Sequence, residues 1–216
     1  MRLLLTKKRL AEGVELLCSK DKLLRSVVDR LGSPPQWYRR PGFRTLLYLI
    51  LEQQVSLASA RAIWNKLVAL KQSEPTPSKF LEITDEELRS VGFSRQKIRY
   101  GRLLSEAIIL RRIKLDQLQR FDDVNVHAKL TAITGIGRWT ADVYMMEAMR
   151  RADIWPVGDL ALATSVTEVL GLQGRPNVAD LEIIGTRFKP WRSVAARIFW
   201  HHYLSDPKRK GSSKPT

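Results

Sequence analysis

The sequence predicts an all-α fold, and two kinds of observation indicate it. Apolar residues recur at helical spacing between the turn-forming segments, and no stretch alternates with a period of two for long enough to predict a strand. Helix boundaries are marked as well: residues 84–87 (TDEE) are typical of a capping box, and the prolines in 34–35 and 74–77 interrupt helices. No internal repeat is found. With 216 residues the chain can bury one core, in one or two closely packed subdomains.

The expected helices follow from these starts and stops. They cover residues 6–18, 20–31, 43–52, 56–70, 84–92, 94–112, 123–133, 159–170, 178–188 and 190–204, with a further helix after Gly137.

The charge of the chain favours a polyanionic partner. It carries 37 Lys and Arg against 22 Asp and Glu, a formal net charge of +15. A membrane surface is the competing polyanion, but the longest apolar run, Leu46 to Leu51, is too short to span a bilayer. Because no signal-peptide pattern opens the chain, we expect an intracellular protein: cytoplasmic, with the nucleoid, in a bacterium or archaeon, and nuclear in a eukaryote.

Metal chemistry is not predicted. Cys18 is the single cysteine, which excludes an internal disulfide and a cysteine-ligated metal or iron–sulfur site. The three histidines lack metal-ligand spacing.

Residues 207–216 are basic and lack apolar side chains, so we expect a disordered tail that serves either as a solvated segment with some DNA affinity or as a nuclear import signal.

Residues 130–144 (LTAITGIGRWTADVY) have the pattern of helix, tight turn and helix. Gly135 and Gly137 allow the backbone to bend and bring N–H groups to the surface beside a helix N-terminus, where a phosphate oxygen can be held. Such contacts bind DNA without reading bases. A Gly-x-Gly pair alone is equally compatible with an inert structural turn.

A second turn follows at 155–159 (WPVGD), where Asp159 starts the next helix. Asp is a common N-cap, and that structural role is the simple alternative to a catalytic one. The functional interpretation depends on the order of the parts: hairpin, linking helix, Pro-x-Gly-Asp, then a helix.

This order resembles the helix-hairpin-helix DNA glycosylase superfamily. Within it, GIGRWTAD followed by PVGDLAL is similar to the DNA-3-methyladenine glycosylase II branch, as are residues 43–60 (FRTLLYLILEQQVSLASA) and 189–200 (KPWRSVAARIFW). The resemblance covers most of residues 20–205. It implies one glycosylase unit over residues 1–206, made of two closely packed helical subdomains with a DNA cleft between them.

The implied activity is DNA repair by hydrolytic excision of alkylated purines. Breaking the N-glycosidic bond gives the sugar an oxocarbenium-like positive charge, which the carboxylate of Asp159 can stabilise while it orients or deprotonates water. Glycosidases pair two carboxylates because their leaving group needs a proton, whereas an N3- or N7-alkylated purine is already cationic, so one acid suffices.

The resemblance also implies a base pocket, a DNA contact surface and a labile cation. A flipped, electron-poor base stacks well on aromatic faces. For the aromatic residues named next, packing in the core is the alternative role, and for Gln53 and Gln54 it is solvation at the end of a helix. The implied base-pocket residues are Trp139, Trp200, Gln53, Tyr48 and Tyr144. The implied DNA contacts are Gln54, which plugs the gap left by the base, with Ser56, Thr134, Gly135, Ile136, Gly137, Arg138 and Thr140. The carbonyls of Thr131, Ile133 and Ile136 would hold a monovalent or other labile cation; no cofactor is required.

Trp139 occupies the position at which bifunctional relatives carry a Schiff-base lysine, so the resemblance implies a monofunctional enzyme that leaves an abasic site. The expected partner is double-stranded DNA containing alkylated bases, bound by a monomer and away from membranes. Two rivals remain: a non-catalytic DNA-binding or damage-sensing protein, and a glycosylase for deaminated or mismatched bases.

Overall fold

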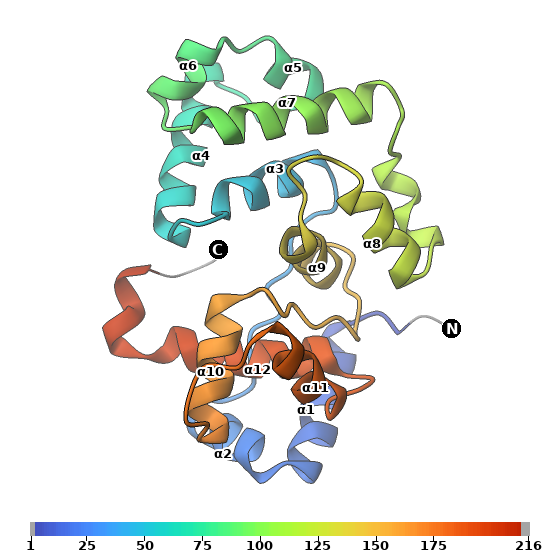
Figure 1. Ribbon diagram of the computed structural model, residues 1–216, viewed down its shortest axis with the longest axis vertical. Helices are drawn as coiled ribbons and strands as arrows, with labels where there is room; N and C mark the ends of the chain where they lie inside the picture. Colours follow the sequence, from blue (N-terminus) through green and yellow to red (C-terminus); the bar gives the residue numbers. More distant parts are fainter. Residues whose placement is uncertain (1–2, 213–216) are drawn as a thin grey trace. The chain divides into compact units, whose positions relative to one another are not determined.

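The computed structural model describes residues 3–212, with side chains through 209, and its regular elements over that range are helices (Figure 1). An isolated antiparallel bridge joins Leu4 and Arg151. The all-α prediction is therefore confirmed. The elements are α1 (Lys7–Lys20), α2 (Lys22–Leu31), α3 (Phe43–Glu52), α4 (Leu57–Lys71), α5 (Pro77–Leu81), α6 (Asp85–Ser90), α7 (Arg95–Ile109), η1 (Leu115–Arg120), α8 (Asp123–Thr131), α9 (Arg138–Glu147), α10 (Leu160–Leu170), α11 (Val178–Thr186), α12 (Arg192–Ser205) and η2 (Pro207–Ser212).

The chain divides into two compact units, and α9 runs from one into the other. The first unit comprises residues 3–38 and 145–211. Its centre is α12, which packs against α1, α2 and α10. Every residue of α12 from Ser193 to Trp200 is buried. A helix buried on all sides must bury its polar groups with partners, and Ser165 of α10 donates its hydroxyl to the carbonyl of Phe199 at 2.6 Å.

Arg197 also binds backbone carbonyls inside this unit. Its guanidinium donates to the carbonyl oxygens of Gln36, Ser193 and Met146 at 2.9 to 3.1 Å. Complete burial lowers the pKa of Arg197 to about 10. The side chain therefore joins α12 to the end of α9 and to the segment that follows α2.

The second unit comprises residues 39–144 and has α3 at its centre. This helix packs against α4 and α7, and α7 packs in turn against α5 and α6. The buried Glu52 at the end of α3 forms two hydrogen bonds with Arg39, at 2.9 and 3.0 Å. Bidentate pairing of this kind satisfies both oxygens of a carboxylate that burial removes from water.

The structure differs from the sequence prediction at three short segments. Helix α5 and the 3-10 helix η1 were not among the expected helices, because a single turn is too short to show a periodic pattern. The third is η2, in the tail for which we expected disorder. There Arg209 pairs with Glu168 of α10 and lies 4.4 Å from the ring centre of Tyr203, so one guanidinium holds the segment against the first unit. Residues 213–216 lie outside the described range.

None of the described helices is long and apolar enough to cross a membrane.

Candidate DNA-binding and catalytic site

The hairpin predicted from the Gly-x-Gly pattern joins α8 to α9. Ile133 and Ile136 are buried and anchor the turn, whereas Thr134 and Gly137 are exposed. Gly135 has φ +100°, and a Cβ there would stand 2.3 Å from the ring of Tyr100 in α7. The turn therefore requires glycine at 135 for two reasons, backbone conformation and the close approach of an aromatic ring.

Gly137 differs from its neighbour, because nothing lies within 4 Å of the position that its Cβ would take. It is the residue before α9, whose first member, Arg138, has a half-exposed side chain. Free backbone N–H groups and the positive end of a helix dipole meet at such a position. The local geometry is therefore suited to holding a phosphate oxygen.

Gln53, predicted to lie close to the base pocket, donates instead to the hairpin. Its amide nitrogen lies 2.9 Å from the carbonyl oxygen of Gly135 and 3.0 Å from Oγ1 of Thr140. Lys97 of α7 donates to the carbonyl of Leu51 at 2.7 Å, and burial lowers the pKa of this lysine. These bonds tie the end of α3 to the hairpin and to α7, so the loop after α3 and the hairpin form one connected surface within the second unit.

That loop presents Gln54 to solvent. Gln54 has φ +57°, in the left-handed region that non-glycine residues seldom occupy, and its side chain is exposed. Ser56 caps α4, its hydroxyl accepting the N–H of Ser59 at 3.1 Å. A strained, exposed residue beside a well-capped helix is typical of a functional loop.

Two of the predicted pocket residues have the contacts of core side chains. Tyr144 is fully buried, its hydroxyl accepts the N–H of Gly42 at 3.0 Å, and burial raises its pKa to about 12. Tyr48 packs edge-on against Trp64 at 5.2 Å and lies under the guanidinium of Arg39. Burial raises the pKa of Tyr48 too. We therefore assign both tyrosines to packing.

Asp159 lies in the first unit and begins α10. Its Oδ1 accepts the N–H of Leu162 at 2.7 Å and the indole N–H of Trp200 at 3.0 Å. The preceding turn is closed by the bond from the amide of Asp159 to the carbonyl of Pro156, at 2.9 Å. The helix-cap role expected for Asp159 is therefore real, and two donors on the same oxygen fix the orientation of a half-buried carboxylate.

Trp200 thus reaches Asp159 although 41 residues separate them in the sequence. Its ring is nearly buried and meets Trp37 edge-to-face, with 6.3 Å between the ring centres. Trp37 also lies 6.4 Å from the ring of His201, and its φ of +41° is unusual for an aromatic residue. Trp37 was not predicted as a site residue, and its only signal in the sequence is that it lies two residues after Pro35.

The other carboxylates near the hairpin and the Asp159 turn are paired. Asp142 is buried between Arg138 and His127, at 3.8 and 3.7 Å. Asp153 accepts hydrogen bonds from the guanidinium of Arg192 at 2.8 and 3.0 Å. Ion pairing of this kind suits a structural role, so Asp159 remains the best catalytic candidate of the three.

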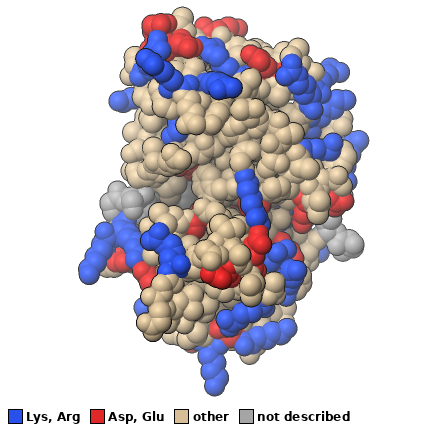
Figure 2. Space-filling view, viewed as in Figure 1, with Lys and Arg blue, Asp and Glu red and all other residues tan. Residues whose placement is uncertain are grey.

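The exposed basic residues are not equivalent either. Figure 2 shows Lys and Arg gathered over the end of α7 and the segment after it, where Arg111, Arg112 and Lys114 are exposed. Arg102, in contrast, bonds to the carbonyl of Ile83 and pairs with Asp85. In α7 and the segment after it, therefore, some cations are exposed at the surface and others, such as Arg102, are bound within the protein.

A helical fold with this hairpin and a capping Asp defines the class of helix-hairpin-helix DNA repair proteins. Residues 47–190 match the model of the HhH-GPD superfamily of base excision DNA repair proteins, and the chain belongs to this family.

Individual relatives are similar over most of the chain. An alkylbase DNA glycosidase-like protein of Schizosaccharomyces pombe is 27% identical over 85% of this chain and 89% of its own length. The 3-methyladenine DNA glycosylase of the same yeast, solved in complex with abasic DNA, superposes with a TM-score of 0.82 at 25% identity, covering 88% of this chain and 95% of that one. A DNA-3-methyladenine glycosidase structure from Bacillus halodurans gives a TM-score of 0.74 at 29% identity, covering 91% of both chains.

Proposed function

We propose that this protein is a monofunctional DNA glycosylase that flips alkylated purines, of the 3-methyladenine and 7-methylguanine type, out of double-stranded DNA and hydrolyses their N-glycosidic bond. The single observation that carries the proposal is Asp159, held by Leu162 and Trp200 at the start of α10 in a chain of the base excision repair family. The relatives named for 3-methyladenine support the substrate class.

In the reaction, the bond from C1′ to the base nitrogen breaks and its electron pair leaves with the base. An N3- or N7-alkylated purine becomes neutral as it departs, so no acid is needed to protonate it. The negative charge of Asp159 stabilises the sugar cation. Water then adds to C1′ and gives its proton to the carboxylate or to solvent, leaving an abasic site.

The two hydrogen bonds to Oδ1 prepare Asp159 for this step. A carboxylate that is already oriented does not have to reorganise as charge develops on the sugar, and that preorganisation is the main source of electrostatic catalysis. Trp200 therefore has a role besides stacking: its indole N–H aligns the acid. Within the first unit we keep Trp200 as an aromatic group that receives the base, and add Trp37 as the ring that supports it. Trp139, in the second unit, stays a separate proposal for the same role.

The hairpin would hold the DNA backbone through the N–H groups around Gly137, and Gln54 would fill the space that the base leaves. The carbonyls of Thr131, Ile133 and Ile136 would hold a monovalent or other labile cation, which would supply positive charge next to the bound phosphate. The carbonyl of Ile133 already accepts the N–H of Ile136 at 2.9 Å and has a second lone pair to offer.

The direct test is mass spectrometry of bases released from methylated duplex DNA. We expect free 3-methyladenine and 7-methylguanine, and strand breaks that appear only after alkali treatment. The absence of breaks before alkali follows from Trp139, which cannot form the imine that a lyase requires. If the folded protein released no base from any alkylated or deaminated substrate, the assignment as a glycosylase would be wrong.

One observation favours the alternative of a non-catalytic DNA-binding protein: the N-cap bond to Leu162 alone gives Asp159 a structural purpose. Such a protein would bind abasic or alkylated DNA with the same hairpin and release nothing. The base-release experiment separates the two functions.

A further inference from the structure

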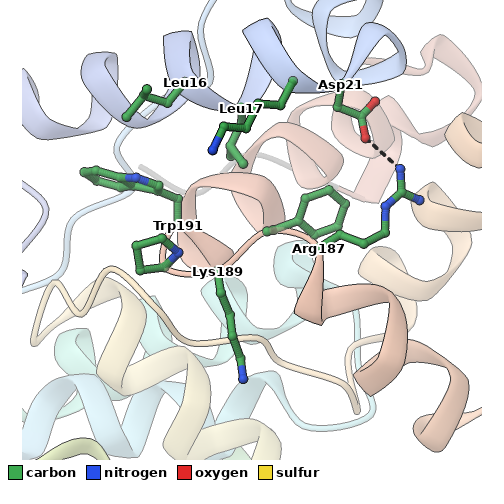
Figure 3. A pocket seen from close by; sticks show the side chains of 9 residues that line it. Leu16, Leu17, Asp21, Arg187, Lys189 and Trp191 are labelled. Carbon is green, nitrogen blue, oxygen red and sulfur yellow. Dashed lines mark hydrogen bonds and ion pairs between the residues drawn. The ribbon is translucent and has the colours of Figure 1, made fainter.

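A small cavity lies in the first unit between α1 and the segment that joins α11 to α12. It has a volume of about 150 Å³ and is lined by Leu16, Leu17, Lys20, Asp21, Arg187, Phe188, Lys189, Pro190 and Trp191. Figure 3 shows Leu16, Leu17 and Trp191 around the cavity, Asp21 paired with Arg187 at its side, and Lys189 directed away from it. None of these residues has a part in the proposed reaction.

The walls of the cavity are held in place by contacts outside it. The ring of Trp191 packs directly on α1 at Gly13, where a Cβ would stand 2.7 Å from the ring. Arg187 bonds to Oδ2 of Asp21 at 3.0 Å and lies over the ring of Phe188 at 5.7 Å. The cavity is therefore preformed, which reduces the entropy that a ligand must lose on binding.

The volume of the cavity suits one apolar side chain, and Leu16, Leu17, Phe188, Pro190 and Trp191 form the apolar part of its lining. An apolar cavity of about 150 Å³ accommodates a benzene-sized group. Leu16 is 46% exposed at its edge, and Trp and Arg, both present here, are the residues most enriched at binding hot spots. This combination is typical of a pocket that takes a leucine or phenylalanine from a peptide.

The charge around the cavity favours an acidic ligand. Its lining has three basic residues and one acid, and that acid is already neutralised. Oδ1 of Asp21 accepts the N–H groups of Leu23 and Leu24, and its other oxygen is paired with Arg187. Asp21 and Arg187 neutralise each other, so carboxylates beside the apolar anchor would meet the positive charge of Lys20 without repulsion from Asp21.

The cavity is also separate from the catalytic residues of its own unit. Trp191 precedes the first turn of α12, and Trp200 lies nine residues further along the same helix. At a rise of 1.5 Å per residue, that is about 14 Å. A ligand at Trp191 would not touch Trp200, so occupancy of the cavity is compatible with an active enzyme.

We propose that this cavity is a docking site for a partner protein that presents a short acidic peptide with a leucine or phenylalanine anchor. The anchor inserts between Leu16, Phe188 and Trp191, and a flanking Asp or Glu residue pairs with Lys20. The proposal does not depend on glycosylase activity, because it concerns a different surface.

The test is selection of phage-displayed random dodecapeptides on the full chain in the presence of excess duplex DNA, which occupies the DNA-binding surface. We expect enriched peptides that combine an apolar anchor with acidic neighbours. Their affinity should fall at least about tenfold for Leu16→Glu, which loses the apolar contact and adds repulsion, and severalfold for Lys20→Gln. Protein labelled with 5-fluorotryptophan should show a shifted Trp191 resonance on peptide binding, assigned with Trp191→Phe.

The chain offers matched controls for both substitutions. Leu23 is also 46% exposed but does not line the cavity, so Leu23→Glu should leave peptide binding unchanged. Lys22→Gln is the control for Lys20→Gln. The proposal is overturned if no acidic peptide is enriched, or if Leu16→Glu and Leu23→Glu bind the selected peptides equally. It is also overturned if the pocket variants weaken DNA binding instead, because the cavity would then belong to the DNA surface.

Discussion

The hairpin and the Asp159 turn are both short connections between helices, yet they present different groups. At the hairpin the large side chains of Ile133 and Ile136 face the core, and the exposed turn consists mostly of backbone. At the Asp159 turn the group of interest is a side chain, because the carboxylate of Asp159 is oriented by the N–H of Leu162 and the indole N–H of Trp200. A backbone surface binds phosphate whatever the DNA sequence, whereas chemistry at C1′ needs one charge at one place.

DNA binding and base excision should therefore respond differently to mutation. Binding should depend on the shape of the hairpin and on the number of nearby cations, with each side chain contributing a little. Excision should depend steeply on Asp159 and on the residues that orient it.

Asp159→Asn should cause the largest loss. Asn keeps the size and the capping ability of Asp, so stability should change by no more than about 1 kcal/mol. Loss of a comparable preorganised electrostatic group lowers rates by about 100- to 1000-fold. We expect single-turnover excision of 3-methyladenine to fall by at least that factor with DNA affinity retained, and hypoxanthine, a neutral leaving group, to be affected more than 7-methylguanine.

Asp122→Asn is the matched control, because Asp122 caps α8 with the same geometry, its carboxylate accepting the N–H of Asn125 at 2.8 Å. This variant should excise normally. Wild-type excision by folded Asp159→Asn would make Asp159 only a helix cap, and Asp142 or Asp153 would have to supply the charge.

The next largest effect concerns Trp200. Its role as hydrogen-bond donor to Asp159 and its role as a stacking surface can be separated by two substitutions. Trp200→Phe retains an aromatic face but loses the donor to Asp159, so we expect excision to fall about tenfold. Trp200→Ala loses stacking as well, worth about 1–3 kcal/mol per base elsewhere, and should cost up to about 100-fold. Rates should be measured under single turnover and thermal stability recorded in parallel. If Trp200→Ala is much less stable but the folded fraction excises at the normal rate, Trp200 is only a core residue.

The two glycines of the hairpin should separate stability from binding. Gly135→Ala places a methyl group against Tyr100 at a positive φ, so both melting temperature and DNA affinity should fall. Gly137→Asp has room for its side chain, so the fold should hold while affinity for every duplex falls about tenfold through repulsion of phosphate. Gly174→Asp adds the same charge at another open position, as a control. Equal affinities for Gly137→Asp and Gly174→Asp would place phosphate elsewhere.

Most of the helices could be predicted because their ends are encoded locally. The capping residues Ser56, Thr84, Ser94 and Asp159 each accept the expected backbone N–H. The hairpin was predictable for the same reason, since Gly135 and its neighbours specify the turn over a few residues. Short elements such as α5 were missed because one turn has no period.

The parts of the site that the sequence did not predict depend on distant contacts. Gln53 bonds to Gly135 across 82 positions, and Trp37 meets Trp200 although they lie at opposite ends of the chain. Tyr144 was implied as a pocket residue by the resemblance, and a resemblance alone cannot tell a ring that faces a ligand from one that faces the core. These distinctions require the packed structure.

The smallest effect concerns the salt dependence of binding to undamaged duplex. If roughly six phosphates are neutralised, log K should fall with log salt at a slope near −5. Arg138→Gln removes a half-exposed cation beside the hairpin and should reduce the slope by about one. Arg102→Gln should lower thermal stability but leave the slope unchanged, because that guanidinium is bound to Ile83 and Asp85. Asp159→Asn should leave the slope unchanged as well, since the carboxylate acts on the sugar rather than on the counterions that binding releases. If Arg102→Gln and Arg138→Gln changed the slope equally, the division between internal and DNA-facing cations would be wrong, and α7 would have to be counted as part of the phosphate surface.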